Sequence, residues 1–519
     1  MKLRSMGTAD EIETRARTVP MVNCSDLYPA FMNDYLVYVL QARHGDDPEK
    51  KRLFREKMDR LTASSRQEKN LFYMEMACHL RDAIKCRCLG YRNEPLALET
   101  ARFFFQLRIV NPARRVYGSV DALCHRDVLL DRYGYEAPPG KDFVFVFVSD
   151  KRPSAYKQTA VRAATEFLSV DPRIENGYAL VTYREDGARR FQVVETDPES
   201  AETIRGMIRR VRFAFRLAED MELGKEIHPI FYPNMKNRDI WMPEKKAVNE
   251  TIGGDITSLW GCDDRHRQRA FRQRIWSWKD PRLTPEILGF VDRGKREILS
   301  RILETNRGGD NDWIRVPDGF LDAWDELRDK TPADCADMVF LDFEYTREFT
   351  YLVGVVHNNE YTALWADSLD REAEHRLLTA TAGFLRGLPA NATVWYWHAE
   401  AGKWRSLCDR HKTIPRLHTG WHDLCHLMRG SGITMRGALD YSLKSVAAAL
   451  VVNDRLDEGY AGLECQDGEA SIAIAEAFYK NRDAELYRVL ETYNRMDCVV
   501  MQRALEEILS AAAGSTNKN

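Results

Sequence analysis

The chain has 519 residues, of which 44% are hydrophobic and 30% are charged, and its formal net charge at pH 7 is −3. A chain of this length is too long for a single hydrophobic core, so the sequence predicts two or three domains. The balanced charge excludes a protein that is basic over its whole surface, and any surface for a polyanion must therefore be local.

The hydrophobic pattern gives no sign of a membrane or secreted protein. No window reaches about 18 uninterrupted apolar residues, and the first twenty residues contain no signal-peptide core. The eleven cysteines are scattered, and the closest set, Cys78, Cys86 and Cys88, lacks repeated CxxC pairs. We therefore expect an intracellular protein, cytoplasmic or nuclear, with reduced thiols and no membrane contact.

Residues 1–206 are predicted to form a first domain that mixes helices and strands. The apolar residues have helical spacing at 26–42, 51–86 and 157–170, and strand-like segments lie at 102–110, 114–130 and 142–151. Residues 177–186 and 189–197 are typical of a β-hairpin.

Residues 207–335 are predicted to form a helical middle region that is rich in Arg and Trp. The segment 258–290 alone contains six arginines and three tryptophans. Arg and Trp interleaved in this way can grip a nucleic-acid backbone and stack on bases. The alternative is a small helical subdomain with an aromatic core and a solvated basic face.

Residues 336–510 are predicted to form a third domain, and residues 511–519 a disordered tail. Three consecutive strands at 337–346, 349–359 and 360–368 precede a helix at 371–388, a strand at 392–398 and a helix at 399–411. Further helices follow and end near Leu509. Three antiparallel strands followed by alternating helices and a parallel strand predict a mixed sheet flanked by helices.

Four acids of this third domain are candidates for one metal site. Asp342 and Glu344 lie on one face of the first strand, and Glu400 begins the helix after the fourth. Asp497 lies four residues after Tyr493, on the same face of the last helix. Converging carboxylates favour hard divalent cations, and two Mg²⁺ or Mn²⁺ ions about 4 Å apart can activate water for phosphodiester hydrolysis.

Each of these signals also has an ordinary structural interpretation. An Asp-x-Glu pair is common at polar strand ends, and an acid such as Glu400 is favoured at a helix N-terminus. Tyr493 and Asp497 alone would be a half-buried aromatic and an exposed acid. The order of the acids and the types of elements that carry them favour the metal site.

The third domain resembles the DEDD 3′–5′ exonucleases of the ribonuclease H-like superfamily, in the subgroup with a tyrosine in the third motif. The resemblance rests on LDFE at 341–344, YLVGV at 351–355, DL at 423–424, YSLKSVA at 441–447 and YNRMD at 493–497. It implies that Asp342, Glu344 and Asp497 are metal ligands, that Tyr493 positions the attacking water, and that the substrate is DNA or RNA.

The second motif departs from the family pattern, because its usual aspartate is absent from WYWHAEAGKW at 395–404. Glu400 takes the ligand role by resemblance to relatives that fuse a RecB-like domain to such a unit. Asp423 is the alternative ligand, although we expect it to cap a helix. Lys444 is a candidate phosphate contact and His398 a candidate substrate contact, while a solvated lysine and a structural histidine are the alternatives.

The first domain resembles the PD-(D/E)XK, or RecB-like, nucleases, which have a restriction-endonuclease-like α/β core. The resemblance implies a site made of Asp121, Asp150, Lys151 and Gln158. Ser149 stands where the second acid is expected, and Asp150 points to the opposite strand face unless a bulge intervenes. The cysteines that hold an iron–sulfur cluster in several such nucleases are missing, so we expect no cluster.

Two functions follow from these resemblances. The first is a Mg²⁺- or Mn²⁺-dependent 3′–5′ exonuclease that acts on single-stranded ends. The second is a non-catalytic nucleic-acid-binding or assembly protein that keeps both nuclease folds as scaffolds. Four mutually repelling acids favour the first for the third domain.

Overall fold

The computed structural model describes most of the chain and divides it into two compact units, Met1–Asp255 and Ile256–Asn519. The boundary falls inside the predicted middle region, and the division into three domains stays a prediction. The close cysteines Cys78, Cys86 and Cys88 lie outside the described residues. The described residues are 21–23, 27–77, 83–85, 98, 102–111, 113–220, 227–308, 313–346, 348–389, 392–414, 420–460, 462–465 and 468–516.

Unit 1 combines helices with one large sheet. Its elements are β1 (Val22–Asn23), α2 (Tyr28–Phe31), α3 (Leu36–His44), α4 (Pro48–Ala77), β2 (Ala83–Lys85), β3 (Phe103–Asn111), β4 (Val116–His125), α5 (Arg126–Tyr133), β5 (Phe143–Val148), α6 (Ala155–Leu168), β6 (Tyr178–Glu185), β7 (Ala188–Glu195), α7 (Pro198–Asp220) and α8 (Met242–Thr251).

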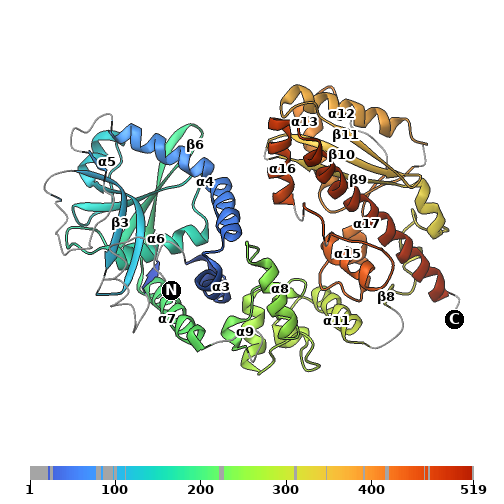
Figure 1. Ribbon diagram of the computed structural model, residues 1–519, viewed down its shortest axis with the longest axis horizontal. Coiled ribbons are helices and arrows are strands. Elements are labelled where there is room, and N and C mark those ends of the chain that lie inside the picture. The colour runs from blue at the N-terminus through green and yellow to red at the C-terminus, as the bar shows by residue number, and fades with distance from the viewer. Residues whose placement is uncertain are drawn as a thin grey trace. The chain divides into compact units, whose positions relative to one another are not determined.

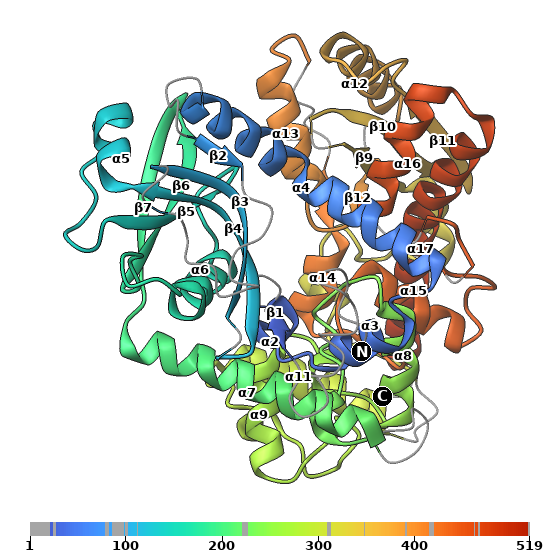
Figure 2. The same ribbon diagram turned by 60° about the vertical axis from the view of Figure 1, so that its left-hand side comes forward.

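The sheet of unit 1 has the strand order β2-β3-β4-β5-β6-β7, and β1 also pairs with β4. Strands β3, β4 and β5 are antiparallel neighbours, and β6 is parallel to β5 because α6 connects them. Figure 2 shows these strands side by side, with α6 against them. All six side chains of β5 are buried, as expected for a central strand covered on both faces.

Two local features of unit 1 test the sequence prediction. The hairpin is confirmed, with β6 and β7 paired from Tyr178 opposite Glu195 to Glu185 opposite Ala188. The strand predicted over 114–130 is wrong beyond residue 125, where α5 begins. His125 accepts a hydrogen bond from the backbone N–H of Asp127 and so caps this helix. The Val and Leu residues that follow His125 are typical of a strand, so the sequence pattern does not indicate the start of a helix here.

Unit 2 carries the remaining elements. They are α9 (Asp264–Arg272), α10 (Pro285–Leu288), α11 (Arg293–Arg307), β8 (Ile314–Arg315), β9 (Val339–Tyr345), β10 (Thr350–His357), β11 (Glu360–Trp365), α12 (Arg371–Arg386), β12 (Val394–Tyr396), α13 (Glu400–Arg410), β13 (Trp421–Asp423), α14 (Leu424–Ser431), β14 (Thr434–Met435), α15 (Leu443–Val452), α16 (Gly468–Asn481) and α17 (Ala484–Thr516).

The main sheet of unit 2 is mixed, as the sequence predicts. Its order is β11-β10-β9-β12-β13, in which β11, β10 and β9 are antiparallel neighbours and β12 and β13 run parallel to β9. Apolar side chains of β9 and β10 pack on α12 and α13 at one face. Helix α17 covers the other face (Figure 1). The sheet is therefore buried on both sides around β9.

Helix α17 is longer than the sequence predicts. It continues to Thr516, through residues that the sequence assigns to a disordered tail. Ala512 is buried in the core of unit 2, and this packing explains why the helix does not end at Leu509. Across the described ranges, no helix is both long and apolar enough to cross a membrane.

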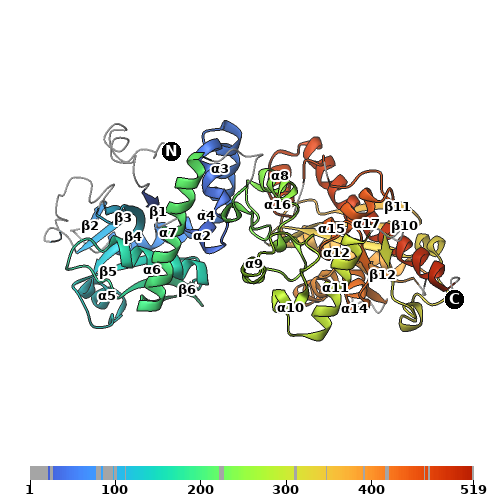
Figure 3. The same cartoon turned by 90° about the horizontal axis from the view of Figure 1, so that it is seen from below.

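The Arg- and Trp-rich segment contains helices α9 and α10, which are joined by a loop and precede α11 (Figure 3). Trp278 is buried, and Trp260 packs against the core of unit 2. Arg267 is only 2% exposed, and Arg269 donates to backbone carbonyls at the end of α10. These contacts favour the structural interpretation for these four residues, whereas Trp276 remains 39% exposed.

Candidate metal centre

Three carboxylates meet where β9 faces α17. Along β9, Leu341 and Phe343 point toward α12 and α13, so strand alternation turns Asp342 and Glu344 toward α17. Asp497 projects from α17. One carboxylate oxygen from each of the three acids lies within 4.8 Å of the others. Among the described residues, no other group of three or more Asp, Glu, His or Cys side chains is as close.

The three carboxylates accept hydrogen bonds from neighbouring neutral groups. The Ser471 hydroxyl, on α16, donates to Glu344 at 2.8 Å, and the Tyr351 hydroxyl lies 3.5 Å from the same oxygen. The Tyr460 hydroxyl donates to Asp497 through a short hydrogen bond. Glu344 and Asp497 are 6% and 7% exposed, so these contacts fix acids that water barely reaches.

Burial raises the pKa of each acid, and repulsion from neighbouring acids adds to the rise for Asp342 and Glu344. Burial is the main cause for Asp342, whose pKa lies well above its usual range, and Asp497, Glu344 and Glu400 add repulsion. Burial, followed by repulsion from Asp497, raises the pKa of Glu344 to about 8. Burial raises the pKa of Asp497 to about 7. The hydrogen bonds and positive charge that the protein supplies therefore do not offset the free-energy cost of ionising these acids in a buried site.

The donor set fits a hard divalent cation. All three acids offer oxygen atoms, which are the ligands that Mg²⁺ and Mn²⁺ prefer, and in the part of the chain that the structure describes no thiol or imidazole joins the group. A cation between the oxygens would replace the repulsion among buried charges with attraction. The residues Asp342, Glu344 and Asp497 are thus suited to hold such an ion.

Glu400 lies at the edge of this group. It is the first residue of α13 and is not among the three acids within 4.8 Å. Burial is the main cause that raises its pKa to about 7, with repulsion from Asp423 and Asp497, while the backbone N–H groups of Glu400 and Ala399 lower it. Glu400 is therefore close enough for Asp423 and Asp497 to raise its pKa. Its role as a ligand stays a prediction.

The backbone before Glu400 has an unusual conformation. His398 is exposed and adopts φ +78°, in the left-handed region that non-glycine residues rarely occupy. Its backbone N–H donates to Asp423 at 3.1 Å, and Asp423 also accepts from the His426 N–H at 2.9 Å as the N-cap of α14. The capping role predicted for Asp423 is confirmed. Asp423 also holds the turn that leads to Glu400.

Lys444 brings positive charge to the site. Its Nζ lies 5.3 Å from the ring centroid of Tyr460 and 5.4 Å from that of Tyr493, and the two ring centroids are 5.9 Å apart. The ammonium group of Lys444 lowers the pKa of both Asp497 and Glu344. Burial, then Asp497, Glu344 and Asp342, raise the pKa of Tyr493 far above its usual value, so its hydroxyl stays protonated.

The residues predicted for a site in unit 1 do not form a comparable cluster. Asp121 lies on β4, accepts a hydrogen bond from the Val148 N–H at 2.9 Å, and pairs with Lys69 of α4 at 2.6 Å. Asp150 and Lys151 follow the end of β5 and are exposed, whereas Ser149 is buried. Among the described residues, Asp121 therefore has a lysine partner rather than two further acids.

Gln158 also lies in unit 1, on α6, where its side-chain amide donates to the Pro153 carbonyl at 3.2 Å. Its neighbour Lys157 is partly desolvated by burial, which lowers its pKa, while Asp121 and Asp150 act in the opposite direction. The basic groups near Asp121 are thus Lys69 and Lys157, and neither is among the residues predicted for this site.

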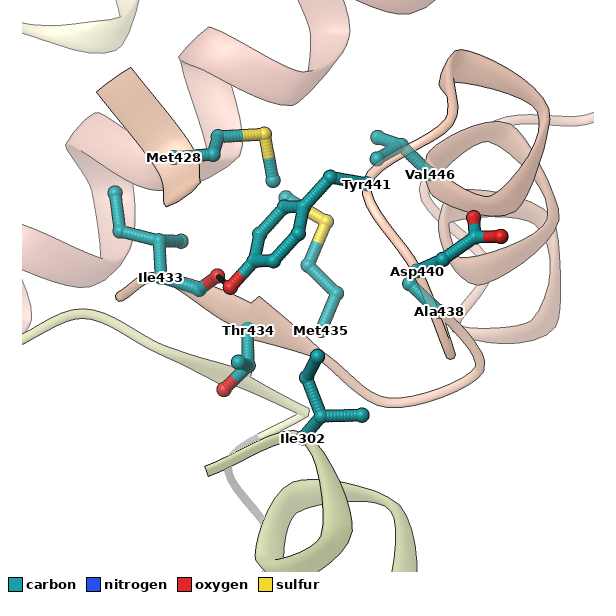
Figure 4. A pocket seen from close by; sticks show the side chains of 9 residues that line it. All are labelled: Ile302, Met428, Ile433, Thr434, Met435, Ala438, Asp440, Tyr441 and Val446. Carbon is teal, nitrogen blue, oxygen red and sulfur yellow. Dashed lines mark hydrogen bonds between the residues drawn. The ribbon is translucent and has the colours of Figure 1, made fainter. Parts of the chain in front are cut away.

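A small pocket of unit 2 lies elsewhere (Figure 4). It is bounded by Ile302 of α11 and by side chains between Met428 and Val446, most of them apolar. Tyr441 lies among them and donates its hydroxyl hydrogen to the Ile433 carbonyl at 3.0 Å. None of the candidate acids is among the described residues that line it. The pocket is a packing gap and not part of the metal centre.

Sequence reasoning misses the neutral residues around the acids. Tyr351 lies in the quoted YLVGV segment and Asn494 in YNRMD, so their positions in recognised motifs were an available signal. Tyr460 and Ser471 lie in segments with no recognisable pattern, and only the fold brings them to Asp497 and Glu344.

Residues 339–509 match the family model described as the RNase_H superfamily. A comparison with curated proteins finds no match, and neither does a comparison with solved structures. The matched segment begins with β9 and extends into α17, so it contains the elements that carry the three clustered carboxylates. Residues 339–509 are therefore a ribonuclease H-like domain.

Proposed function

We propose that unit 2 is a metal-dependent nuclease that removes nucleotides from the 3′ end of single-stranded DNA or RNA. The observation that carries this proposal is the group of three carboxylates, two of them buried and one half-buried, with oxygens within 4.8 Å, inside a ribonuclease H-like domain. The tyrosine one helical turn before Asp497 supports the assignment to the 3′–5′ exonuclease group.

Asp342, Glu344 and Asp497 are the proposed ligands of Mg²⁺ or Mn²⁺, and Glu400 is the proposed ligand of a second ion. When bound, these cations supply the activation of water and the stabilisation of the leaving oxygen. Tyr493 keeps its proton, because burial and the neighbouring acids raise its pKa. It therefore acts as a hydrogen-bond donor that orients the attacking water and not as a base.

Lys444 is the proposed contact for a substrate phosphate, because its ammonium group lies beside Tyr493 and near the acids. His398 is the proposed contact for the substrate beyond the acids, since it is exposed two residues before Glu400. Both assignments place a positive or polar group where a polyanion would approach the buried carboxylates of Glu344 and Asp497.

The test of the proposed function is a cleavage assay with the full chain. Single-stranded DNA and RNA with a 5′ label are incubated with Mg²⁺ or Mn²⁺, and matched samples contain EDTA. We expect a ladder that shortens from the 3′ end only with metal, and intact circular single strands. A protein that binds these metals but degrades neither linear substrate would refute the nuclease proposal. Cleavage of the circular strands, which have no ends, would refute the exonuclease assignment.

We expect Tyr493→Phe to reduce cleavage by about 10- to 100-fold, because one hydrogen bond to a reacting group is lost. Mn²⁺ affinity is expected to stay unchanged, since the phenol is not a proposed ligand. Tyr441→Phe is the matched control, because it removes a hydroxyl from the pocket in Figure 4. Equal activity of Tyr493→Phe and wild type would contradict the water-orienting role.

We further propose that unit 1 is a PD-(D/E)XK-like domain that no longer cleaves. Its order of three antiparallel strands, a helix and a parallel strand supports the likeness. The ion pair between Lys69 and Asp121 supports the loss of cleavage, because the ammonium group occupies one oxygen of the candidate ligand. Such a unit is suited to bind nucleic acid or to support the nuclease.

We therefore expect Asp121→Asn to leave cleavage within about twofold of wild type, while it weakens unit 1. Loss of one partner of a partly buried ion pair such as this one costs about 1–3 kcal/mol. Denaturant unfolding measures this loss, and the double variant Lys69→Met/Asp121→Asn is expected to recover part of it. Loss of all cleavage in folded Asp121→Asn would show that unit 1 holds an active site.

A further inference from the structure

Asn494 is a fully buried amide that links two strands of the sheet to the metal centre. It follows Tyr493 on α17 and is 0% exposed. Its Nδ2 donates to Oδ2 of Asp342 at 2.7 Å, and its Oδ1 accepts a hydrogen bond from the Tyr361 hydroxyl at 2.9 Å. Asp342 lies on β9 and Tyr361 on β11, so Asn494 reaches across the intervening β10.

The Asp342 carboxylate sets which way the amide of Asn494 faces. A carboxylate can only accept a hydrogen bond, so Asp342 requires the NH₂ group. The Tyr361 hydroxyl, which can donate or accept, then donates to the carbonyl oxygen. A flipped amide would place its carbonyl against the carboxylate and lose the bond to Asp342. The pair of contacts therefore holds the donor toward Asp342.

Gly354 provides the space that this side chain needs. Gly354 on β10 lies directly opposite Asp342 in the β9–β10 register. A Cβ atom added to Gly354 would lie 1.6 Å from Oδ1 of Asn494 and 2.7 Å from its Cγ. No side chain larger than hydrogen fits there unless Asn494 moves. A glycine is thus required at this position of the YLVGV motif, because the Asn494 side chain lies so close to the backbone of Gly354.

We propose that Asn494 is a positioning residue of the metal centre, which holds one oxygen of Asp342 so that the other oxygen faces the cation. Gly354 and Tyr361 act through Asn494, the first by leaving space and the second by anchoring the amide oxygen with a hydrogen bond. The inference rests on the proposed function, because it assigns Asp342 as a metal ligand.

Neutral hydrogen bonds to a ligand carboxylate are one means by which a protein fixes a metal site. Their removal typically reduces metal affinity by about 10- to 100-fold. Asn494 is buried between Asp342 and Tyr361, so no water is available to replace its NH₂ group without rearrangement. We therefore expect the ligand geometry to depend on this one amide.

The test measures Mn²⁺ affinity by calorimetry and steady-state cleavage for the full chain. Asn494→Ala is expected to weaken Mn²⁺ binding by about 10- to 100-fold. Excess Mn²⁺ is expected to restore part of kcat, because the ligands themselves remain. Tyr361→Phe is the milder variant, and we expect a smaller loss in the same direction. Circular dichroism in EDTA confirms that each variant is folded.

Gly354→Ala provides a second test, through a double-mutant cycle. It is expected to weaken Mn²⁺ binding because it displaces Asn494. In the Asn494→Ala background, the same substitution is expected to add much less, since the clash with Asn494 is gone and only the Tyr361 ring carbon at 3.0 Å remains close. Asn453→Ala is the matched control, because it removes another side-chain amide, at the end of α15, that donates to the backbone carbonyls of Arg436 and Ala449.

The outcomes separate this inference from the proposed function. If wild type binds Mn²⁺ and cleaves, and Asn494→Ala matches it in both, the positioning role is refuted. If wild type binds Mn²⁺ but does not cleave, the nuclease proposal fails, while weaker binding in Asn494→Ala still supports the positioning role. If wild type binds no Mn²⁺, both fail, because Asp342 is then no ligand.

Discussion

Asp342→Asn is expected to abolish metal-dependent cleavage and, at the same time, to stabilise the metal-free protein. The substitution keeps the shape of the side chain but removes one of three carboxylates whose oxygens lie within 4.8 Å of one another. Loss of a metal ligand removes about 3 kcal/mol or more of transition-state stabilisation, which is a reduction of at least about a hundredfold in rate.

The gain in stability comes from the repulsion that Asp342 shares with its neighbours. Burial raises the pKa of Asp342, and Asp497, Glu344 and Glu400 raise it further. The ionised form of Asp342 is therefore destabilised when no cation is present. We expect Asp342→Asn to raise the melting temperature in EDTA at about pH 8 by about 2–4 °C for each kcal/mol that is relieved. Differential scanning calorimetry measures the shift.

Asp370→Asn is the matched control for this experiment. Asp370 is the N-cap of α12, and asparagine caps a helix as well as aspartate does. The control is therefore expected to leave both cleavage and stability almost unchanged. Cleavage that survives in folded Asp342→Asn would exclude Asp342 from the active site, and a lower melting temperature in EDTA would contradict the repulsion argument.

The metal-free protein is expected to lose stability as the pH rises from about 5 to about 8.5. The folded-state pKa values of Glu344, about 8, and of Asp497, about 7, lie above the ordinary values of 4.5 and 3.8. At a pH between the unfolded and the folded pKa of each acid, the folded protein retains a proton that the unfolded chain has released. The stabilising contribution is thus complete below the unfolded pKa values and is lost as the pH passes through 7 and 8.

Divalent cations reverse this pH dependence, because they bind only ionised carboxylates. We expect Mn²⁺ affinity to rise from about pH 6 to about pH 8.5 and the melting temperature at the higher pH to recover when Mg²⁺ is added. Glu344→Gln removes one of the raised groups, so the pH slope in EDTA is expected to be shallower. An identical slope in wild type and Glu344→Gln would refute the assignment of the buried protons.

The sequence predicts the sheet of unit 2 well, because its signals are strong and local. Three apolar strands with short turns identify β9, β10 and β11, and the next strand follows a clear helix. Asp342, Glu344 and Asp497 are also predicted to converge, since strand alternation and helical spacing fix the faces on which they lie. The structure brings their oxygens together.

The remaining parts of the site depend on contacts that no local pattern encodes. Tyr460 and Ser471 reach the acids from a loop and from α16, and only the packing of these segments places them there. In unit 1, Lys69 lies on α4, far in sequence from Asp121, so the ion pair that neutralises this acid was not predictable. Such long-range polar pairs follow from the tertiary fold and not from periodicity.

The position of the ligands along the chain has a consequence for the synthesis of the protein. Asp342 and Glu344 lie on β9, whereas Tyr493, Asn494 and Asp497 all lie on α17, after most of unit 2 has been made. Closing so long a loop is entropically costly, and a domain folds as its chain emerges from the ribosome. The nascent protein therefore cannot bring its three clustered carboxylates together until α17 has been synthesised and docked.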